Sequence, residues 1–406
     1  MGLVRRRLPR WSELQPLLRQ QRVPLDPVER RLGRAHTIAD LRAIAARRLP
    51  RAVFDYADGA ADQEASLRRA RASFARAEFH PMALRDVSTA DTGVTVLGSR
   101  WPLPFALAPT GFTRLMHHDG EKAAVRAAER AGLTFALSTM GTTSIEEVAA
   151  EAPGARKWFQ LYLWRDRAAG QDLIERAREA GYEALVLTVD TPVGGARMRD
   201  VRNGLTIPPA LTPSTVLDAA LHPAWWFNLL TTDPLTFASL HEWHGTVAEL
   251  VNTMFDPSVT FADIEWLRAA WPGPLLLKGI HTVSDARTAV AHGADGIIVS
   301  SHGGRQLDRA AAPLEVLPAI ADAVGDEAEV LLDTGIMNGG DVVAALALGA
   351  KGCLVGRAYL YGLMAGGERG VERAITILAE EVTRTLRLLG VRSAAELNRS
   401  HVSLRR

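Results

Sequence analysis

The chain has 406 residues, 47% of them hydrophobic, so it can bury a large core as one big domain or two ordinary ones. Its 47 basic and 46 acidic residues leave a net charge of +1, which gives no electrostatic basis for binding nucleic acid. The single cysteine, Cys353, excludes an internal disulfide and predicts a reducing, cytoplasmic location. No run of about twenty apolar residues is present, so we expect no membrane-spanning segment.

The first 95 residues lack the alternation of apolar runs and helical stretches that marks the rest of the chain. They contain a helix-forming stretch at Thr37–Arg48, the pair Leu49–Pro50 and a second short stretch at Phe54–Ala61. We predict that residues 1–95 form a helical extension that packs on a domain formed by residues 96–406.

From residue 104 onward, eight short apolar runs alternate with stretches that have charged faces. Continuous apolar runs, rather than alternating ones, predict parallel strands covered on both faces. The runs are Pro104–Thr110, Thr134–Met140, Lys157–Tyr162, Glu183–Asp190, Pro274–Ile280, Gly296–Ser301, Glu329–Thr334 and Gly352–Arg357. The helical stretches between them include Gly120–Ala131, Gln171–Ala180, Val283–His292 and Gly340–Leu348.

Eight strand–helix repeats predict a (β/α)8 barrel, the TIM-barrel fold of the α/β class. A doubly wound open sheet is the weaker alternative, because no Gly-x-Gly-x-x-Gly motif follows an early strand.

The connection between the fourth and fifth predicted strands, residues 191–273, is much longer than an ordinary barrel loop. A connection of this length is usually a lid, an interface or a mobile segment. It contains Trp225, Trp226 and Phe227. Amphipathic aromatic side chains favour the head-group region, so residues 219–232 are a candidate for peripheral contact with the cytoplasmic face of the cell membrane. Packing of these rings on the barrel or on a sister subunit explains them equally well.

In a (β/α)8 barrel the catalytic groups follow the carboxyl ends of the strands. Residues 300–308, Ser-Ser-His-Gly-Gly-Arg-Gln-Leu-Asp, follow the sixth strand. Their His302 can accept a proton near neutral pH, and Arg305 can hold a carboxylate with two parallel hydrogen bonds. Asp190 can stabilise a protonated His302, and Arg197 can share the carboxylate with Arg305. Each residue alone is more often structural, but such groups recur at most strand ends.

Other strand ends suggest a cofactor rather than a metal. Lys278 ends an apolar strand, and because a buried, unpaired lysine is costly, it implies an anionic or electron-accepting partner. Gly335, Gly356 and Arg357 follow the seventh and eighth strands, where barrels commonly bind phosphate. A flat heterocycle that becomes anionic on reduction satisfies both features.

These motifs resemble those of the FMN-dependent L-2-hydroxy acid oxidase and dehydrogenase family, and most closely its bacterial quinone-type L-lactate dehydrogenases. The similarity runs from about residue 37 to residue 401, and the motif at 300–308 is highly specific. Residues 54–59, 159–162, 195–200 and 356–361 support it.

The resemblance implies a role for each matched residue. His302 would be the base, paired with Asp190. The substrate would be bound by Arg197, Arg305, Tyr56 and Tyr162. FMN would be bound by Ala108, Pro109, Thr110, Ser138, Gln160, Thr188, Lys278, Asp333, Thr334, Gly335, Gly356 and Arg357, with Lys278 beside flavin N1 and Asp333, Gly335, Gly356 and Arg357 at the phosphate. The family resemblance also implies a homotetramer.

The resemblance implies oxidation of an L-2-hydroxy acid, foremost L-lactate to pyruvate, with a quinone or cytochrome as electron acceptor. An oxidase of the glycolate, mandelate or lactate type, which uses O2 and releases H2O2, is the main alternative. A flavin-binding barrel without catalysis and a flavin isomerase are weaker ones.

Four positions depart from the family pattern. Ser301 stands where the family has Asn, Thr334 replaces the first of two glycines, and Met337 stands where many members place a phosphate-binding Arg. Met140 replaces an aromatic residue of several oxidases. We therefore expect altered hydrogen bonding around the base and one cation fewer at the phosphate.

Overall fold

The computed structural model describes residues 7–17, 24–205, 213–236, 238 and 255–405. Within them, eight parallel strands close into a barrel in the order in which they occur along the chain. They are β4 (Phe105–Leu107), β5 (Thr134–Ser138), β6 (Arg156–Tyr162), β7 (Ala184–Thr188), β8 (Leu275–Ile280), β9 (Gly296–Val299), β10 (Glu329–Leu332) and β11 (Gly352–Val355). Each strand overlaps one of the eight predicted runs, and β11 pairs with β4 to close the barrel. The predicted (β/α)8 fold is confirmed.

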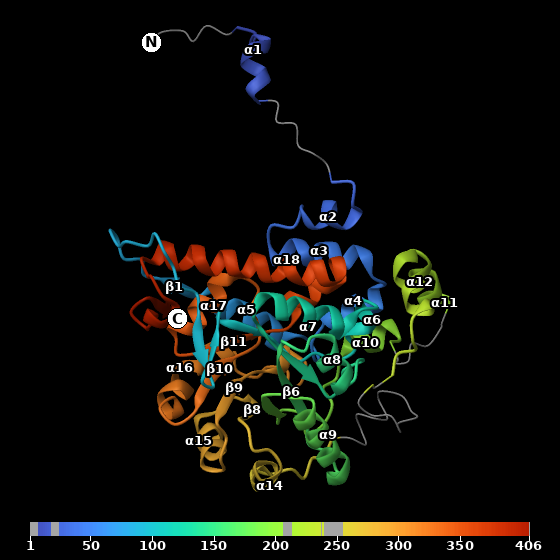
Figure 1. Ribbon diagram of the computed structural model, residues 1–406, viewed down its shortest axis with the longest axis vertical. Coiled ribbons are helices and arrows are strands. Elements are labelled where there is room, and N and C mark those ends of the chain that lie inside the picture. The colour runs from blue at the N-terminus through green and yellow to red at the C-terminus, as the bar shows by residue number, and fades with distance from the viewer. Residues whose placement is uncertain (1–6, 18–23, 206–212, 237, 239–254, 406) are drawn as a thin grey trace.

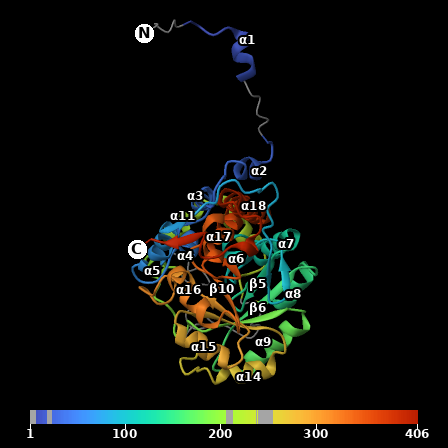
Figure 2. The ribbon, with the colours of Figure 1, turned by 90° about the vertical axis from the view of Figure 1, so that its left-hand side faces the viewer.

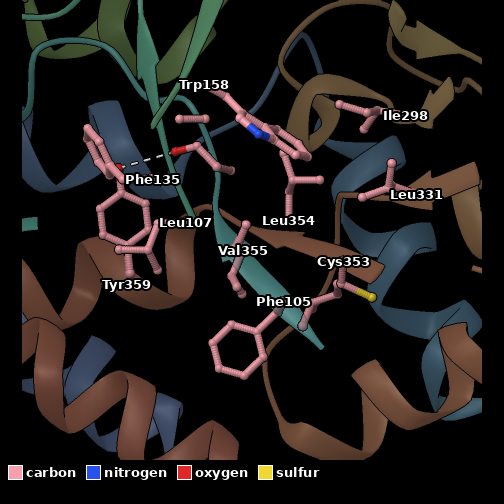
Figure 3. Close-up of a cluster of buried hydrophobic side chains, with 14 of the residues drawn as sticks. Phe105, Leu107, Phe135, Trp158, Ile298, Leu331, Cys353, Leu354, Val355 and Tyr359 are labelled. Atoms are coloured by element: carbon pink, nitrogen blue, oxygen red, sulfur yellow. Dashed lines mark hydrogen bonds between the residues drawn. The ribbon is translucent and has the colours of Figure 1, made fainter. Parts of the chain in front are cut away.

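The barrel strands are apolar because both of their faces are covered. Every residue of β5, β7, β9 and β11 is buried. Side chains of different strands, among them Trp158, Ile298, Leu331 and Leu354, meet in one buried cluster (Figure 3). Cys353 belongs to this core, where burial raises the pKa of its thiol.

Helices surround the barrel as the alternating pattern predicts (Figure 1). They are α6 (Thr113–Met116), α7 (Gly120–Ala131), α8 (Ile145–Glu151), α9 (Arg167–Glu179), α15 (Val283–Ala291), α16 (Pro313–Val324), α17 (Gly339–Ala347) and α18 (Arg357–Leu389). α7 has the predicted bounds, and α9, α15 and α17 differ from theirs by a few residues. α18 is broken at Gly366 and Gly367, whose backbone angles are not helical.

The N-terminal part of the chain is helical: residues 27–75 pack against the rest of the protein, whereas residues 11–17 lie away from the barrel and bury no side chain (Figure 1). Its helices are α1 (Trp11–Leu14), η1 (Gln15–Leu17), α2 (Pro27–Leu32), α3 (Ile38–Arg48), α4 (Arg51–Asp58) and α5 (Ala65–Ala75). A capping box between Thr37 and Asp40 starts α3, which lies within the predicted stretch Thr37–Arg48. α2, α3 and α18 lie on the same side of the barrel in both views (Figures 1 and 2). Short strands complete the fold: β1 (Ala77–Phe79) pairs with β12 (Val402–Leu404), and β2 (Val94–Val96) pairs with β3 (Ser99–Trp101), while η3 (Ala394–Glu396) precedes β12.

The long connection after β7 carries helices of its own. They are α10 (Met198–Asn203), α11 (Pro213–Ala220), α12 (Pro223–Thr231) and α14 (Asp263–Ala270). Parts of the predicted segment 191–273, namely 206–212, 237 and 239–254, lie outside the described residues. α11 and α12 lie beside α4, α6 and α10 (Figure 1). In the described part of the chain, no helix has the length and apolarity needed to cross a bilayer.

Candidate active site

The predicted base and its partner are in hydrogen-bond contact. His302 begins η2 (His302–Gly304), directly after β9, and Asp190 follows β7. The Nδ1 atom of His302 lies 2.9 Å from Oδ1 of Asp190. This carboxylate fixes the proton on Nδ1 and leaves Nε2 to act as the base. Burial lowers the pKa of His302, and Asp190 partly offsets that effect.

Two arginines converge on one tyrosine ring. The guanidinium carbon of Arg305 lies 5.0 Å from the ring centre of Tyr56, and that of Arg197 lies 5.9 Å from it. Among the described residues, no carboxylate lies within 4.0 Å of either guanidinium. Burial and the neighbouring Arg197 lower the pKa of Arg305 to about 9. Asp200 also lines the site, but burial raises its pKa. A small carboxylate is the anion that suits this pair.

Lys278 is buried but not unpaired. Its Nζ lies 3.2 Å from Oδ2 of Asp333 and donates to Oγ of Ser300 at 3.0 Å. The expected anionic partner of this buried cation is therefore Asp333, so Lys278 does not by itself indicate a cofactor. Burial opposes ionisation of Asp333, yet Lys278, Thr334 and Ser300 together lower its pKa.

Thr334 stands where the family has a glycine, and its side chain makes hydrogen bonds that a glycine lacks. Its φ is 81°, in the left-handed region that favours glycine. Its Oγ1 donates to Oδ1 of Asp333 at 2.6 Å and accepts from the backbone N–H groups of Ser301 at 3.2 Å and Gly303 at 3.1 Å. The hydroxyl thus ties β10 to the turn that carries the base. Oγ of Ser301 is buried without a hydrogen-bond partner among the described residues, and nothing in the structure explains this substitution.

The predicted site residues come together around one cavity of about 450 Å³. Asp190 does not line it and reaches it only through His302. The predicted residues on its wall are Tyr56, Ala108, Pro109, Thr110, Ser138, Gln160, Tyr162, Thr188, Arg197, Lys278, His302, Arg305, Asp333, Thr334, Gly335, Gly356 and Arg357. Met140 and Met337, two of the departures, also line it.

At the end of the cavity where the phosphate is expected, the side chain of Arg357 is bonded to backbone carbonyls. The guanidinium of Arg357 donates to the carbonyls of Ala57 at 2.9 Å, Gly303 at 2.8 Å and Gly59 at 2.6 Å. It therefore ties α4 to the turn that carries the base. The first turn of α18 has no side-chain cap, so its N–H groups are available to an anion.

Two positioning residues were missed by sequence reasoning, although both lie in the motif at 300–308. Oγ of Ser300 bonds to Lys278, to Asp333 at 2.7 Å and to the N–H of His302 at 3.0 Å. Nε2 of Gln306 donates to the carbonyl of Asp190 at 3.1 Å. Ser300 stands two residues before the base, and that spacing was the available signal.

The comparisons with known proteins place the chain in a family. The family described as FMN-dependent dehydrogenase matches residues 45–404. The chain belongs to the FMN-dependent dehydrogenase family. A relative from Mycobacterium tuberculosis is 58% identical over 400 residues, which cover 98% of this chain and 97% of that protein. The L-lactate dehydrogenase of Caulobacter vibrioides is 44% identical over 366 residues, which cover 88% of this chain and 95% of that enzyme.

Solved structures of this family have the same fold. The monotopic membrane protein (S)-mandelate dehydrogenase has a TM-score of 0.87 and 38% identity, and covers 92% of this chain and 100% of its own. A mandelate oxidase has a TM-score of 0.80 and 40% identity, with 91% of this chain and 99% of its own covered. These matches confirm the predicted family, its FMN cofactor and its oxidoreductase class.

The residues on the cavity wall fit FMN. Nε2 of Gln160 and Oγ1 of Thr188 are buried without hydrogen-bond partners among the described residues. Such atoms are costly unless a ligand completes them, and the heteroatoms of a flavin ring provide suitable partners. Oγ of Ser138 donates to Oε1 of Gln160 at 2.9 Å and so turns the amide N–H groups of Gln160 toward other acceptors. The small residue Ala108 leaves room for a flat ring.

Proposed function

We propose that the chain oxidises a small L-2-hydroxy acid to the 2-oxo acid, with L-lactate to pyruvate as the leading case, and passes the electrons to a quinone or cytochrome. The observation that carries this proposal is the His302–Asp190 pair on the same cavity as Arg197 and Arg305, which have no carboxylate partner among the described residues. The L-lactate dehydrogenase relative and the two mandelate-oxidising structures support it, since lactate and mandelate are both 2-hydroxy acids.

The proposed roles follow from the contacts of each side chain. Arg305 and Arg197 bind the substrate carboxylate between them, next to Tyr56. Tyr162, whose pKa is raised by burial, remains a neutral hydrogen-bond donor to the substrate. FMN, when bound, supplies the two-electron acceptor for the reaction.

The proton balance assigns one proton to the histidine. Oxidation of the alcohol carbon removes two electrons and two protons from the substrate. FMN, when bound, would take both electrons and one proton, and Nε2 of His302 would take the other proton, which is the hydroxyl proton if a hydride is transferred and the α-proton if a carbanion forms. Asp190 then stabilises the imidazolium by its charge. Lys278, held by Asp333 and Ser300, lines the same cavity and would place its positive charge beside FMN.

The test is anaerobic reduction of the bound flavin. We expect the purified protein to be yellow and its absorbance to bleach when L-lactate is added without oxygen, whereas D-lactate leaves it unchanged. (S)-Mandelate and glycolate, tried in parallel, define the substrate class. Absence of bleaching with all three acids would overturn the proposed activity and would favour a barrel that binds flavin without catalysis.

An oxidase that uses O2 is the second candidate, because the mandelate oxidase is 40% identical to this chain and the mandelate dehydrogenase is 38% identical to it. Steady-state release of H2O2 in air separates the two. A dehydrogenase turns over slowly with O2 and quickly with a soluble quinone, and an oxidase shows the reverse.

We further infer that the enzyme associates peripherally with the cytoplasmic face of a membrane through residues 219–232. The described residues of this segment support the inference in part. Trp225 packs inward and donates from Nε1 to the carbonyl of Leu115 at 2.8 Å, whereas Phe227 and Leu230 of α12 are exposed. The related structure named as a monotopic membrane protein points the same way.

Three further predictions concern organisation. They are the division of the chain at residues 95 and 96, a lid formed by residues 191–273, and a homotetramer. Sedimentation of the holoenzyme in detergent measures the last of these.

A further inference from the structure

Two arginines bind the broken end of a helix. The first part of α18 ends at Gly366, and the carbonyls before the break need donors from elsewhere. Nε of Arg31 donates to the carbonyl of Ala365 at 2.7 Å, and Nε of Arg48 donates to that of Met364 at 3.3 Å. The two guanidinium groups, one from α2 and one from the end of α3, therefore lie side by side.

Two histidines lie in the same cluster as these arginines. The ring of His117 lies against Gly367, where a Cβ atom would be 2.7 Å from its Cε1. The rings of His117 and His118 stack with their centres 4.3 Å apart. The ligand atoms of His117, His118 and Asp119 lie within 4.8 Å of one another. Burial above all, together with His118 and the nearby arginines, lowers the pKa of His117 to about 4, and this positive surrounding disfavours a metal ion.

Helix capping accounts for only one nitrogen of each arginine. Among the described residues, the terminal nitrogens of Arg31 and Arg48 have no hydrogen bond, and no carboxylate lies within 4.0 Å of them. Both side chains are half-buried. The nearest acids are engaged, because Asp26 pairs with Arg369 and Asp119 lies 3.8 Å from His118. Two partly buried cations thus face the surface without a counter-ion.

The exposed apolar helices α11 and α12 are anchored next to this cluster (Figure 1). The backbone N–H of Arg51, three residues after Arg48, donates to Oδ2 of Asp218 on α11 at 2.7 Å. Trp225 on α12 bonds to Leu115, two residues before His117. The large apolar side chains exposed on these two helices and the turn between them are Val216, Leu217, Leu221, Trp226, Phe227 and Leu230.

We propose that Arg31 and Arg48 bind the phosphate of an anionic phospholipid head group while the apolar side chains of α11 and α12 enter the adjoining membrane interface. The forked guanidinium matches phosphate oxygens, and a phosphate takes up the terminal nitrogens that the protein leaves unbonded. An apolar helix face beside basic side chains is the arrangement of proteins that lie on anionic membranes. The proposal rests on the membrane association inferred above and names the lipid.

The experiment is flotation of the holoenzyme with vesicles of phosphatidylcholine alone or of phosphatidylcholine mixed with phosphatidylglycerol. We expect the unmodified protein to prefer the mixed vesicles. The double variant Arg31→Gln and Arg48→Gln should lose about tenfold or more of its partitioning onto them, since each basic residue at an anionic surface is worth roughly fivefold. Glutamine keeps a side-chain donor for the helix carbonyls, and equal flavin content and unfolding midpoint verify the fold.

A matched control is available on the same two helices. Arg30 and Arg47 each stand one residue away from a cluster arginine and are exposed, with no bond among the described residues. The double variant Arg30→Gln and Arg47→Gln removes the same charge. The fold loss of vesicle partitioning in this control variant should be at most about a third of the loss in the cluster variant. The reason is that Arg30 and Arg47 are not beside the apolar helices.

Each outcome decides the proposal. Equal partitioning of the two double variants would overturn it in favour of unspecific charge. Binding of the unmodified protein to both vesicle types alike would overturn it and leave the apolar contact standing. Lack of binding to any vesicle would overturn the membrane association as well. In a last outcome, inorganic phosphate stabilises the unmodified protein but not the cluster variant, and the protein shows no preference between the vesicles. That result would assign the site to a free phosphate ion instead.

Discussion

The mouth of the barrel and the break in α18 each hold two arginines that have no carboxylate partner among the described residues. At the mouth, Arg305 and Arg197 face Tyr56 on the wall of the cavity, beside His302, which is paired with Asp190. At the break, Arg31 and Arg48 are half exposed and adjoin apolar helices. We expect the pair on the cavity wall to bind a small carboxylate and the pair beside the apolar helices to bind a head group at an interface. Changes at the mouth should therefore affect catalysis alone, and changes at the break should affect vesicle binding alone.

The largest effect is expected at the base. His302→Gln should slow anaerobic reduction of the flavin by L-lactate by about 10²–10⁴, because loss of a general base removes that much rate. Stopped-flow absorbance measures the rate, and the yellow colour and vesicle binding should be retained. A variant that bleaches at the parent rate would show that another group takes the proton.

The next effect is expected at the carboxylate site. Arg305→Met should lower kcat/KM for L-lactate by about 10²–10³, since removing one partner of a buried charge pair costs about 2–5 kcal/mol. Most of the loss should appear as a higher KM, because the arginine binds ground state and transition state alike. The double variant Arg31→Gln and Arg48→Gln is the control and should keep the parent kcat/KM. If it loses activity as well, the two regions do not act separately.

Much of the barrel mouth was predictable because its signals are local. Each strand is a continuous apolar run, and the residue that follows a strand of a closed barrel must lie at one end of it. Strand order therefore brought His302, Asp190 and Arg305 together without any knowledge of distances. At Lys278 the sequence called for an anionic partner but did not show that Asp333, directly after β10, provides it. Pairings between strands depend on side-chain direction, which a single sequence does not state.

The break in α18 was not predictable for a related reason. Gly366 and Gly367 interrupt a helical pattern, but the residues that bind there come from α2, α3 and the loop before α7. Nothing in the spacing of Arg31, Arg48 and His117 brings them together. From the sequence we grouped Trp225 and Trp226 as one aromatic motif, but in the structure Trp225 packs inward and Trp226 is exposed. Helical rotation separates neighbours that a linear motif groups together.

The apolar side of the membrane face should give a smaller effect than the mouth. Phe227→Ser should lower partitioning onto mixed vesicles by about tenfold, since burying a phenylalanine side chain contributes about 1.5–3 kcal/mol and insertion at an interface is partial. Flotation measures it, and kcat/KM in detergent-free buffer should stay at the parent value. Trp225→Phe is the matched control, because its ring packs on Leu115, and unchanged partitioning of that variant is expected. Equal losses in both variants would mean that the segment as a whole, rather than its exposed side, contacts lipid.

The smallest effect concerns pH and again belongs to the mouth alone. For an ordinary histidine with a pKa of about 6.5, the fraction in the neutral form falls roughly threefold between pH 7 and pH 6. Burial lowers the pKa of His302 further than Asp190 raises it, so more of the base stays neutral as the pH falls. The second-order rate of flavin reduction should therefore fall by less than about threefold over this interval. Asp190→Asn removes the group that raises the pKa, so its profile should be flatter still, at a lower rate overall. If the rate of flavin reduction already begins to fall above pH 7, the burial of the base is contradicted. Vesicle binding measured over the same pH interval should not follow this profile.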